Sequence, residues 1–449
     1  MRVWGFLAVI AFCCAFALAA PFSPNNPAPD LRIAITQQEE ATLRVVYEWR
    51  RPQREIMFAA IDGGYRARRW SFATPGFVLK RFDDGDYIMR EDGKRFSRIE
   101  LSARPELNRL SKEYQPVVRY GEGGALLYTG HFWPMMEEGG RVDAVFDFTP
   151  VGDGHVVAFG ANEPAVKAWR SPMAHPAFVY LGPLEPVETK DVMALVDPDA
   201  PGWVVEEFNT IVPDSFAKLS DLFGFAPATK PNLFLSAPIG DEAGRLSYSG
   251  DALPAQFQIT LEGAAWNEPS GKARRVFRHS TIHEAVHLWQ AAARPVIEDA
   301  PEWIHEGAAD AIASEVMVAL GLWDAGALMA TERAAQMECA RGLHGGSLNA
   351  AKSRGAFRAL YACGHVIAAA VAQAEGNSTA AFWRDFIARS VAADGYDADL
   401  FYRTIAERTD DQGFADAIED FARTPLADPA RTIDQLFAEA QTLARERGR

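Results

Sequence analysis

The spacing of apolar residues changes near the middle of the chain. Between residues 41 and 150, short runs of alternating apolar and polar residues are separated by glycine-rich turns, a pattern typical of β-strands. Beyond residue 300, apolar residues recur every three or four positions, which indicates amphipathic helices. The pattern therefore predicts an α+β protein, in which a β-rich N-terminal domain, sandwich-like or saddle-like, precedes a mostly α-helical part.

The strands predicted for the N-terminal domain are short and bounded by turn residues. They lie at residues 43–49, 76–82, 86–92, 124–133 and 143–150, with further strand-like runs at 155–160 and 177–182. The stretch 119–128 contains the turn Gly-Glu-Gly-Gly and is interpreted as a β-hairpin, with a ligand-binding loop as the alternative. We place this domain at residues 41–190.

The second half is predicted to begin with mixed structure and to continue as helices. Residues 201–223 have a helical pattern that Pro213 is expected to interrupt, and 231–237 is predicted to be a buried strand. In 256–263 three apolar residues alternate on one face, as expected for an edge strand. Helical spacing recurs at 307–342, 354–375, 379–391, 397–408, 414–423 and 430–447.

The first residues of the chain have the composition of a secretory signal peptide. Residues 1–19 contain one basic residue, an uncharged apolar run and the small-residue ending Ala-Leu-Ala. We expect cleavage near residue 19 or 20, a loose polar leader over residues 20–40, and no stable membrane insertion of the remaining chain. The expected location is therefore periplasmic or secreted.

Composition narrows the classes of partner. The 449 residues are 48% hydrophobic and 23% charged, which is typical of a globular protein with two or three domains. The net charge of −15 argues against nucleic-acid binding, because phosphate contacts need basic patches. Beyond the leader the only cysteines are Cys339 and Cys363. They are predicted either to form a disulfide in an oxidising compartment or to remain separate buried thiols.

Residues 274–290 contain the pattern His-Glu-x-x-His within a predicted helix. Residues four apart lie on one helical face, so the imidazoles of His283 and His287 can both reach one metal ion. Glu284 lies about 100° round the helix from His283, beside the metal. A general base that acts on a metal-activated water belongs at that place.

The segment 300–310 supplies a third candidate ligand. Glu306 follows the second histidine after an 18-residue spacer, and Asp299 and Pro301 are expected to begin the helix that carries it. Two histidines and a glutamate are an established ligand set for catalytic zinc that leaves one position for water. Asp310, one turn later, is expected to hold the far nitrogen of a ligand histidine. The alternative is that both acids are solvated helix charges.

The sequence His-Glu-x-x-His, an 18-residue spacer and then Trp-Ile-His-Glu-Gly resembles the gluzincin zinc peptidases of the membrane-alanyl-aminopeptidase type. The run His-Leu-Trp-Gln after the second histidine is similar to relatives of glycyl aminopeptidase. The resemblance covers about residues 270–310. It implies a thermolysin-like peptidase domain over residues 191–390, with helices 391–449 packed on it. One Zn²⁺ per chain would be bound by His283, His287 and Glu306, with Glu284 as base.

Two features depart from the pattern of these peptidases. The residue before the third ligand is usually Asn or Asp, whereas here it is His305, which is expected to point elsewhere on its helix. The Gly-x-Met-Glu-Asn strand that anchors a free substrate N-terminus is absent, and residues 263–267 are a poor substitute. The resemblance therefore implies a metallopeptidase and leaves aminopeptidase or endopeptidase action open.

The resemblance also implies a group that stabilises the oxyanion of the reaction, which is a tyrosine in the pattern Tyr-x-Lys-Gly. Tyr361 stands three residues before Gly364 and is expected to take this role, although Cys363 replaces the lysine. His365, one turn later on the same face, is the alternative, and it is also open that neither residue acts. A disulfide from Cys339 to Cys363 would clamp this helix beside Tyr361.

The sequence as a whole predicts an exported zinc metallopeptidase that hydrolyses peptides or proteins, with Glu284 as general base. The alternative hypothesis is a catalytically weak or inactive peptidase-like protein that serves as an envelope binding or scaffold protein. A third hypothesis is a zinc hydrolase that acts on a non-peptide bond. The two departures described above support the second hypothesis, and the intact set of ligands and base supports the first.

Overall fold

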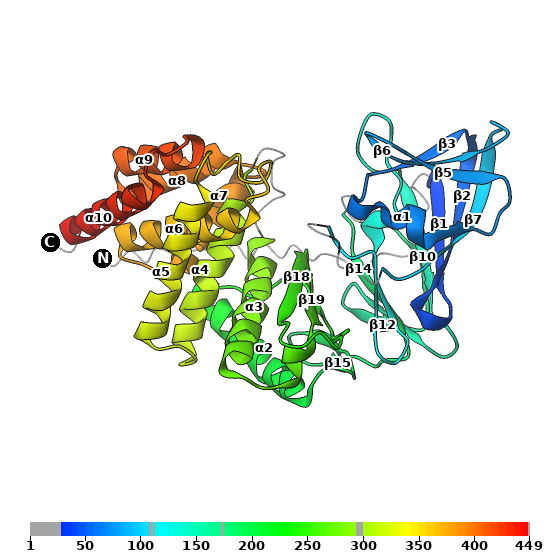
Figure 1. The fold of residues 1–449 in the computed structure, drawn as a ribbon, viewed down its shortest axis with the longest axis horizontal. Coiled ribbons are helices and arrows are strands. Elements are labelled where there is room, and N and C mark those ends of the chain that lie inside the picture. Colours follow the sequence, from blue (N-terminus) through cyan, green and yellow to red (C-terminus); the bar gives the residue numbers. More distant parts are fainter. Residues whose placement is uncertain (1–27, 107–109, 111–112, 172–174, 293–299, 448–449) are drawn as a thin grey trace, which may run out of the picture.

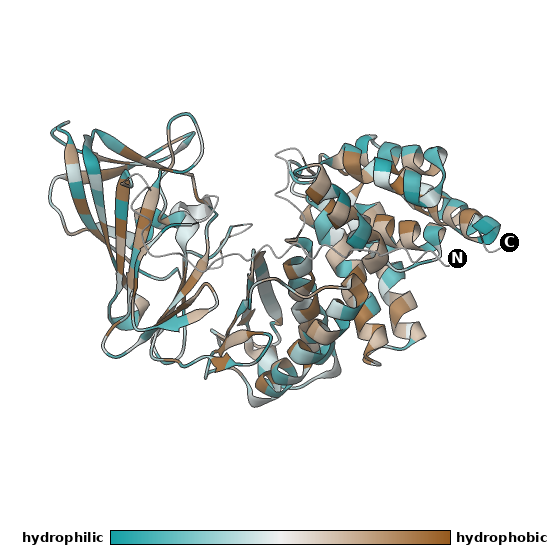
Figure 2. Cartoon of the chain, turned by 180° about the vertical axis from the view of Figure 1, so that it is seen from behind, coloured by the Kyte–Doolittle hydropathy of each residue, from teal (hydrophilic) through white to brown (hydrophobic). Residues whose placement is uncertain are grey.

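The computed structural model describes residues 28–106, 110, 113–171, 175–292 and 300–447. The β-rich part and the helical part stand on either side of a smaller mixed sheet (Figure 1). Hydrophilic and hydrophobic residues alternate along the strands and form stripes along the helices (Figure 2). The predicted α+β order of elements is confirmed. The proposed signal peptide, residues 1–19, lies outside the described residues.

The β-rich domain is a sandwich of two larger sheets with a small third sheet. The six-stranded sheet has the order β13-β10-β1-β2-β7-β4 and the five-stranded sheet the order β12-β11-β14-β9-β8. Their strands are β1 (Leu31–Gln37), β2 (Leu43–Gln53), β4 (Trp70–Phe72), β7 (Phe96–Ala103), β8 (Val117–Arg119), β9 (Ala125–Tyr128), β10 (Ala144–Thr149), β11 (His155–Ala158), β12 (Ala161–Glu163), β13 (Val166–Trp169) and β14 (Phe178–Gly182). The third sheet contains β3 (Glu55–Phe58), β6 (Gly85–Arg90) and β5 (Phe77–Phe82). One apolar core receives side chains from both large sheets, including Ile33, Leu101, Leu127 and Val179.

Two predictions for this domain have clear outcomes. The expected loose leader over residues 20–40 is wrong for residues 31–37, which form β1 between β10 and β2. Leu31, Ile33 and Ile35 are buried at 1%, 0% and 0% exposure. The alternation of apolar and polar residues in this segment therefore indicated a β-strand, although the residues before it are rich in proline. The hairpin predicted at residues 119–128 is confirmed, because β8 pairs antiparallel with β9.

The mixed sheet has the order β15-β16-β17-β19-β18. Its strands are β15 (Val187–Glu188), β16 (Met193–Val196), β17 (Asn232–Ser236), β18 (Ser247–Leu253) and β19 (Gln256–Glu262). Residues 256–263 were predicted to be an edge strand, and this is wrong: β19 lies between β17 and β18, and β18 forms the edge. The polar residues that suggested a solvated face, Gln256, Gln258 and Thr260, are buried and hydrogen-bonded instead.

The β-rich domain is fastened to the mixed sheet by a shared core. Phe234 of β17 is fully buried in a cluster with residues of β8, β9, β11 and β14. The Gln256 amide group accepts from the backbone N–H of Phe178 at 2.9 Å and donates to its carbonyl at 2.8 Å. Asp197 accepts from the backbone N–H of Gly121 at 3.0 Å. Because these polar contacts are paired across a buried interface, the two parts hold one arrangement.

Helices make up the rest of the chain. They are α2 (Gly202–Phe223), α3 (Gly271–Gln290), α4 (Trp303–Ala319), α5 (Ala325–Gly342), α6 (Phe357–Glu375), α7 (Thr379–Ala392), α8 (Ala398–Thr409), α9 (Gln412–Arg423) and α10 (Pro429–Arg447). The expected interruption at Pro213 is wrong, because α2 is continuous and the proline lies on its exposed face, where water can reach the unpaired carbonyl. The predicted helix 307–342 is divided into α4 and α5 at Gly321, whose φ of 69° favours glycine.

Two further features concern α4 and α6. Helix α4 begins at Trp303 rather than at Pro301, and Asp299, its expected cap, lies outside the described residues. By length and composition α6 could cross a membrane, but 72% of its apolar window is buried inside the fold, where it packs as a core helix. A disulfide between Cys339 and Cys363 joins α5 to α6, so of the two alternatives left open by the sequence the structure has the bonded pair.

Candidate metal centre

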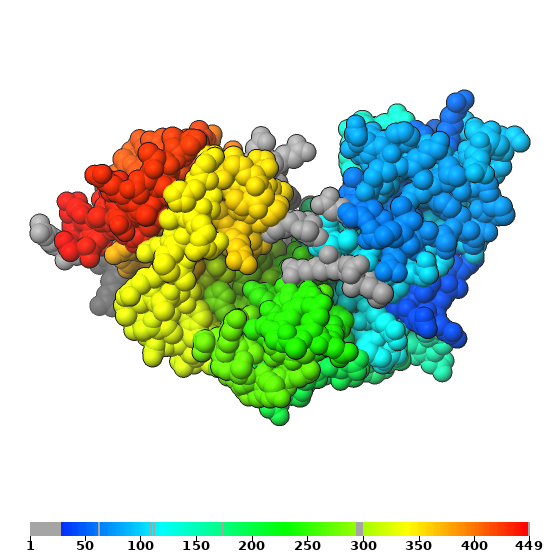
Figure 3. Space-filling model, in the orientation of Figure 1, coloured from blue at the N-terminus to red at the C-terminus, as the bar shows by residue number. Residues whose placement is uncertain are grey.

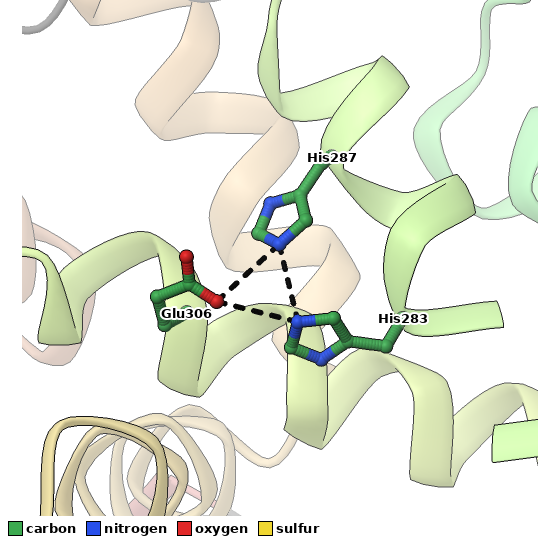
Figure 4. A group of neighbouring side chains, drawn as sticks. All are labelled: His283, His287 and Glu306. Carbon is green, nitrogen blue, oxygen red and sulfur yellow. Dashed lines mark hydrogen bonds and ion pairs between the residues drawn. The ribbon is translucent and has the colours of Figure 1, made fainter. Parts of the chain in front are cut away.

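Three side chains from α3 and α4 converge on one point. His283 Nε2 and His287 Nε2 are 3.2 Å apart, and Glu306 Oε2 lies 3.3 Å from the first and 3.5 Å from the second (Figure 4). Helix α3 supplies both histidines because residues four apart share a face. The predicted ligand set is therefore brought together, and within the described residues it is the group that could hold a metal ion.

The outer nitrogen of each histidine is held by a hydrogen-bond partner. Asp310 Oδ1 accepts from His283 Nδ1 at 3.1 Å, as the sequence predicted. Gln290 Oε1 accepts from His287 Nδ1 at 2.6 Å, and the same amide group donates to the carbonyl of His305 at 3.0 Å. A carboxylate or amide oxygen can only accept, so both Nδ1 atoms carry the proton. When the imidazoles are neutral, both Nε2 atoms turn a lone pair towards Glu306.

Three lone pairs that meet within 3.5 Å repel one another unless a cation lies between them. Burial lowers the pKa of His283, but the hydrogen bonds with Asp310 and Glu306 outweigh burial and raise the pKa well above its ordinary value. A metal ion can take the place of that proton. Tetrahedral zinc with ligands at about 2.1 Å requires ligand atoms about 3.4 Å apart. The separations described above match this requirement, so the side chains fit Zn²⁺.

Glu284 follows the first histidine and lies against the edge strand β18. It is 6% exposed, and burial raises the pKa of its carboxyl group. The strand approaches so closely that a Cβ atom on Gly250 would lie 2.0 Å from Glu284 Oε1. Only glycine leaves room for the carboxylate at this point. Sequence analysis missed Gly250, because its importance depends on a contact between distant segments.

A contact between two glycines sets the distance between α4 and α6. A Cβ atom on Gly307 would lie 2.1 Å from the carbonyl carbon of Gly364, and one on Gly364 would lie 2.1 Å from the carbonyl oxygen of Trp303. Gly307 directly follows Glu306, and Tyr361 stands one turn before Gly364. The close approach therefore brings the tyrosine to the metal centre, where its ring centroid lies 6.0 Å from that of His283.

Asp310 lies within reach of three histidines, of which His283 is the hydrogen-bonded one. His365 Nδ1 is 3.9 Å from Asp310 Oδ2, and His279 Nδ1 is 4.0 Å from Oδ1. The other nitrogen of His279 is 3.2 Å from the hydroxyl of Ser314. His365 is only 3% exposed, and Asp310 is the site residue that its Nδ1 approaches. Tyr361 and His365, which the sequence placed on one helical face, thus have different surroundings.

His305 was expected to point away from the metal centre, and this is wrong. Its Nε2 lies 3.6 Å from Glu306 Oε1, and its ring centroid lies 6.0 Å from that of His287. Gln290 of α3 donates a hydrogen bond to the carbonyl of His305, which ties the start of α4 to α3. Gln290 itself was missed, although its spacing of three after His287 places it on the same helical face.

A hollow separates the helical lobe from the β-rich domain (Figure 3).

Burial raises the pKa of Tyr361, and so do the charges of Glu306, Glu284, Asp251 and Asp310. Tyr361 therefore keeps its phenolic proton and remains a hydrogen-bond donor. Asp251 lies on β18 beside Gly250, so the edge strand brings a further carboxylate near the metal centre.

The fold is that of the M1 zinc metallopeptidases. It is similar to an aminopeptidase N family protein from Idiomarina loihiensis, with a TM-score of 0.64 and 10% identity over 90% of this chain and 78% of that chain. It is also similar to a two-domain M1 zinc metallopeptidase, with a TM-score of 0.54 and 13% identity over 89% of this chain and 95% of that chain. The similarity to yeast LTA4 hydrolase has a TM-score of 0.53 and 11% identity over 89% of this chain and 68% of that chain. No family model matches the chain, and no curated protein matches it by sequence. The fold implied by the sequence motif is confirmed.

Proposed function

We propose that the chain is a zinc-dependent metallopeptidase. The observation that carries this proposal is the convergence of His283 Nε2, His287 Nε2 and Glu306 Oε2 within 3.5 Å of one another. The fold shared with M1 zinc metallopeptidases supports it. The hypothesis of an inactive scaffold protein is not favoured, because the ligands, the base and the partners of both histidines are all in place.

When His283, His287 and Glu306 hold it, Zn²⁺ supplies Lewis acidity that polarises a peptide carbonyl and lowers the pKa of a water molecule. Glu284 adjoins the ligands, and its carboxylate accepts a proton from the attacking water. It then delivers this proton to the nitrogen of the leaving amine. Tyr361 donates its O–H to the oxyanion that develops on the carbonyl oxygen. We prefer it to His365, which is turned towards Asp310.

The substrate that we propose is an extended peptide bound along β18. Among the described residues no strand pairs with the outer edge of β18, so its backbone groups on that side can pair with a peptide. Among structures with this fold, one M1 zinc metallopeptidase is bound to L-tryptophan, and yeast LTA4 hydrolase is in complex with bestatin. These neighbours support an amino-acid or peptide-like ligand, and the position along β18 rests on the free edge of the sheet among the described residues.

We further propose that the chain is exported to the periplasm or secreted. Support comes from the signal-peptide composition of residues 1–19. The disulfide between Cys339 and Cys363 is also stable in an oxidising compartment. Measuring the N-terminal residue of the protein recovered from the periplasm or the medium tests this proposal.

Zinc content tests the metal centre directly. The purified protein is expected to hold about one zinc ion per chain after dialysis, and Glu306→Ala is expected to lose most of it, since a catalytic site needs three protein ligands. The matched control is Glu302→Ala at the residue just before α4, whose carboxylate is 41% exposed and pairs with Lys352. Metal analysis by mass spectrometry gives both values. A wild-type protein that holds no zinc after reconstitution contradicts the proposal.

Gly250→Ala tests the contact between β18 and Glu284. The added methyl group would overlap Glu284 Oε1, so the flexible carboxylate must rotate away. We expect hydrolysis to fall by roughly 10–100-fold, because a displacement of about 1 Å at a reacting group has that effect. Thermal stability should change little, since no backbone atom is pushed. Gly240→Ala is the control, as nothing lies within 4 Å of its Cβ. Equal activity of the two variants would rule out this role for Gly250.

A further inference from the structure

The third ligand has two carboxylate oxygens in different surroundings. Glu306 Oε2 faces the two histidines at 3.3 and 3.5 Å, whereas Oε1 faces His305 Nε2 at 3.6 Å. The side chain is 21% exposed, and the polar groups that face it are the three histidines. Whichever group holds Oε1 decides whether Oε2 points at the metal centre.

His305 lies between this carboxylate and a buried tyrosine. Its Nδ1 is 3.4 Å from the hydroxyl of Tyr396, and its Nε2 faces Glu306. A carboxylate only accepts hydrogen bonds and a phenol donates one, so the order of donors is fixed. Tyr396 O–H donates to Nδ1, and Nε2–H then faces Glu306 Oε1 at 3.6 Å as a polar contact. A neutral imidazole with its single proton on Nε2 satisfies both contacts.

Tyr396 is held rigidly, although it lies in the connection between α7 and α8. Its side chain is 3% exposed and its ring packs against Phe386, with centroids 5.2 Å apart, and against Trp383 at 6.3 Å. The two preceding residues, Asp394 and Gly395, have φ values of 62° and 146°, so the chain makes a tight turn that presents the tyrosine. The hydroxyl therefore has a fixed position relative to α4.

We propose that Tyr396 and His305 are positioning residues, which hold Glu306 Oε1 so that Oε2 alone turns towards the two ligand histidines. This proposal rests on the proposed function as a zinc enzyme and extends it. It assigns a role to the C-terminal helices, because the connection between α7 and α8 then reaches the metal centre through two side chains. Hydrogen-bond partners of metal ligands fix the orientation of those ligands, and their loss weakens metal affinity by about 10–100-fold.

The test measures zinc affinity by competition with a chromogenic chelator, together with the visible absorption spectrum of the cobalt-substituted protein. His305→Leu removes the donor and is expected to weaken zinc binding by about 10–100-fold and to shift the cobalt bands. His305→Gln keeps an N–H near the position of Nε2 and should restore part of the affinity. Tyr396→Phe should weaken binding by a smaller factor, because His305 remains. Circular dichroism shows that each variant is folded.

Tyr402→Phe is the matched control, since this tyrosine is 4% exposed on α8 and its ring packs against Phe401 instead of the metal centre. Its zinc affinity and cobalt spectrum are expected to equal those of the wild type. Wild-type affinity and spectrum in His305→Leu would overturn the positioning role and leave the metallopeptidase proposal intact. A wild-type protein without zinc affinity would overturn both.

Discussion

Glu284→Gln is expected to reduce peptide hydrolysis by about 10²–10⁴-fold, the contribution typical of a general base, while zinc content stays unchanged. The amide has nearly the same shape as the carboxylate but cannot take a proton from water. The metal should remain because Glu284 is not one of the three converging groups. The replacement also removes a buried charge beside Gly250, so the folded state should lose no stability.

The measurement is the rate of hydrolysis of a peptide library that the wild-type protein cleaves, with zinc content determined on the same samples. Glu206→Gln is the matched control, because Glu206 is exposed on α2 and far in sequence from the ligands. It should hydrolyse peptides at the wild-type rate. Hydrolysis by Glu284→Gln at more than about a tenth of the wild-type rate would show that another group is the base.

The ligands were predictable because their arrangement is local. Residues four apart on a helix must share a face, so His283 and His287 could be paired from spacing alone. Asp310 could be placed for the same reason, one turn after Glu306. In the structure these four side chains lie side by side. Here the sequence was sufficient because helix geometry leaves few alternatives.

The surroundings of the ligands could not be predicted, because they depend on contacts between distant segments. Gln290 of α3 binds the carbonyl of His305, and the His305 side chain reaches Tyr396, which stands 91 residues later. Gly250 matters only because β18 lies on α3. In the mixed sheet, the polar Gln256 suggested that one face of its strand is exposed to solvent, although its amide group is buried against the β-rich domain. A polar residue that is paired after folding cannot be told from an exposed one by periodicity.

Gly307→Ala is expected to destabilise the protein by roughly 2 kcal/mol or more, the range for an overpacked core. In an open helix the same change stabilises by about 1 kcal/mol, because alanine is the better helix former. Here the added Cβ meets the carbonyl carbon of Gly364 at 2.1 Å and the backbone nitrogen of His365 at 2.4 Å. Backbone atoms cannot rotate away as a flexible side chain can. The helices α4 and α6 must therefore move apart.

That movement should affect the metal centre as well as stability, since Glu306 precedes Gly307 and Tyr361 lies on α6. We expect a lower melting temperature, by about 4–8 °C for a domain of this size, together with weaker zinc binding. Gly202→Ala is the control, because nothing lies within 4 Å of its Cβ at the start of α2, and its melting temperature should equal or exceed that of the wild type. Equal melting temperatures for Gly307→Ala and Gly202→Ala would mean that α4 and α6 are not held at contact distance. The placement of Tyr361 beside the zinc ligands would then need another cause.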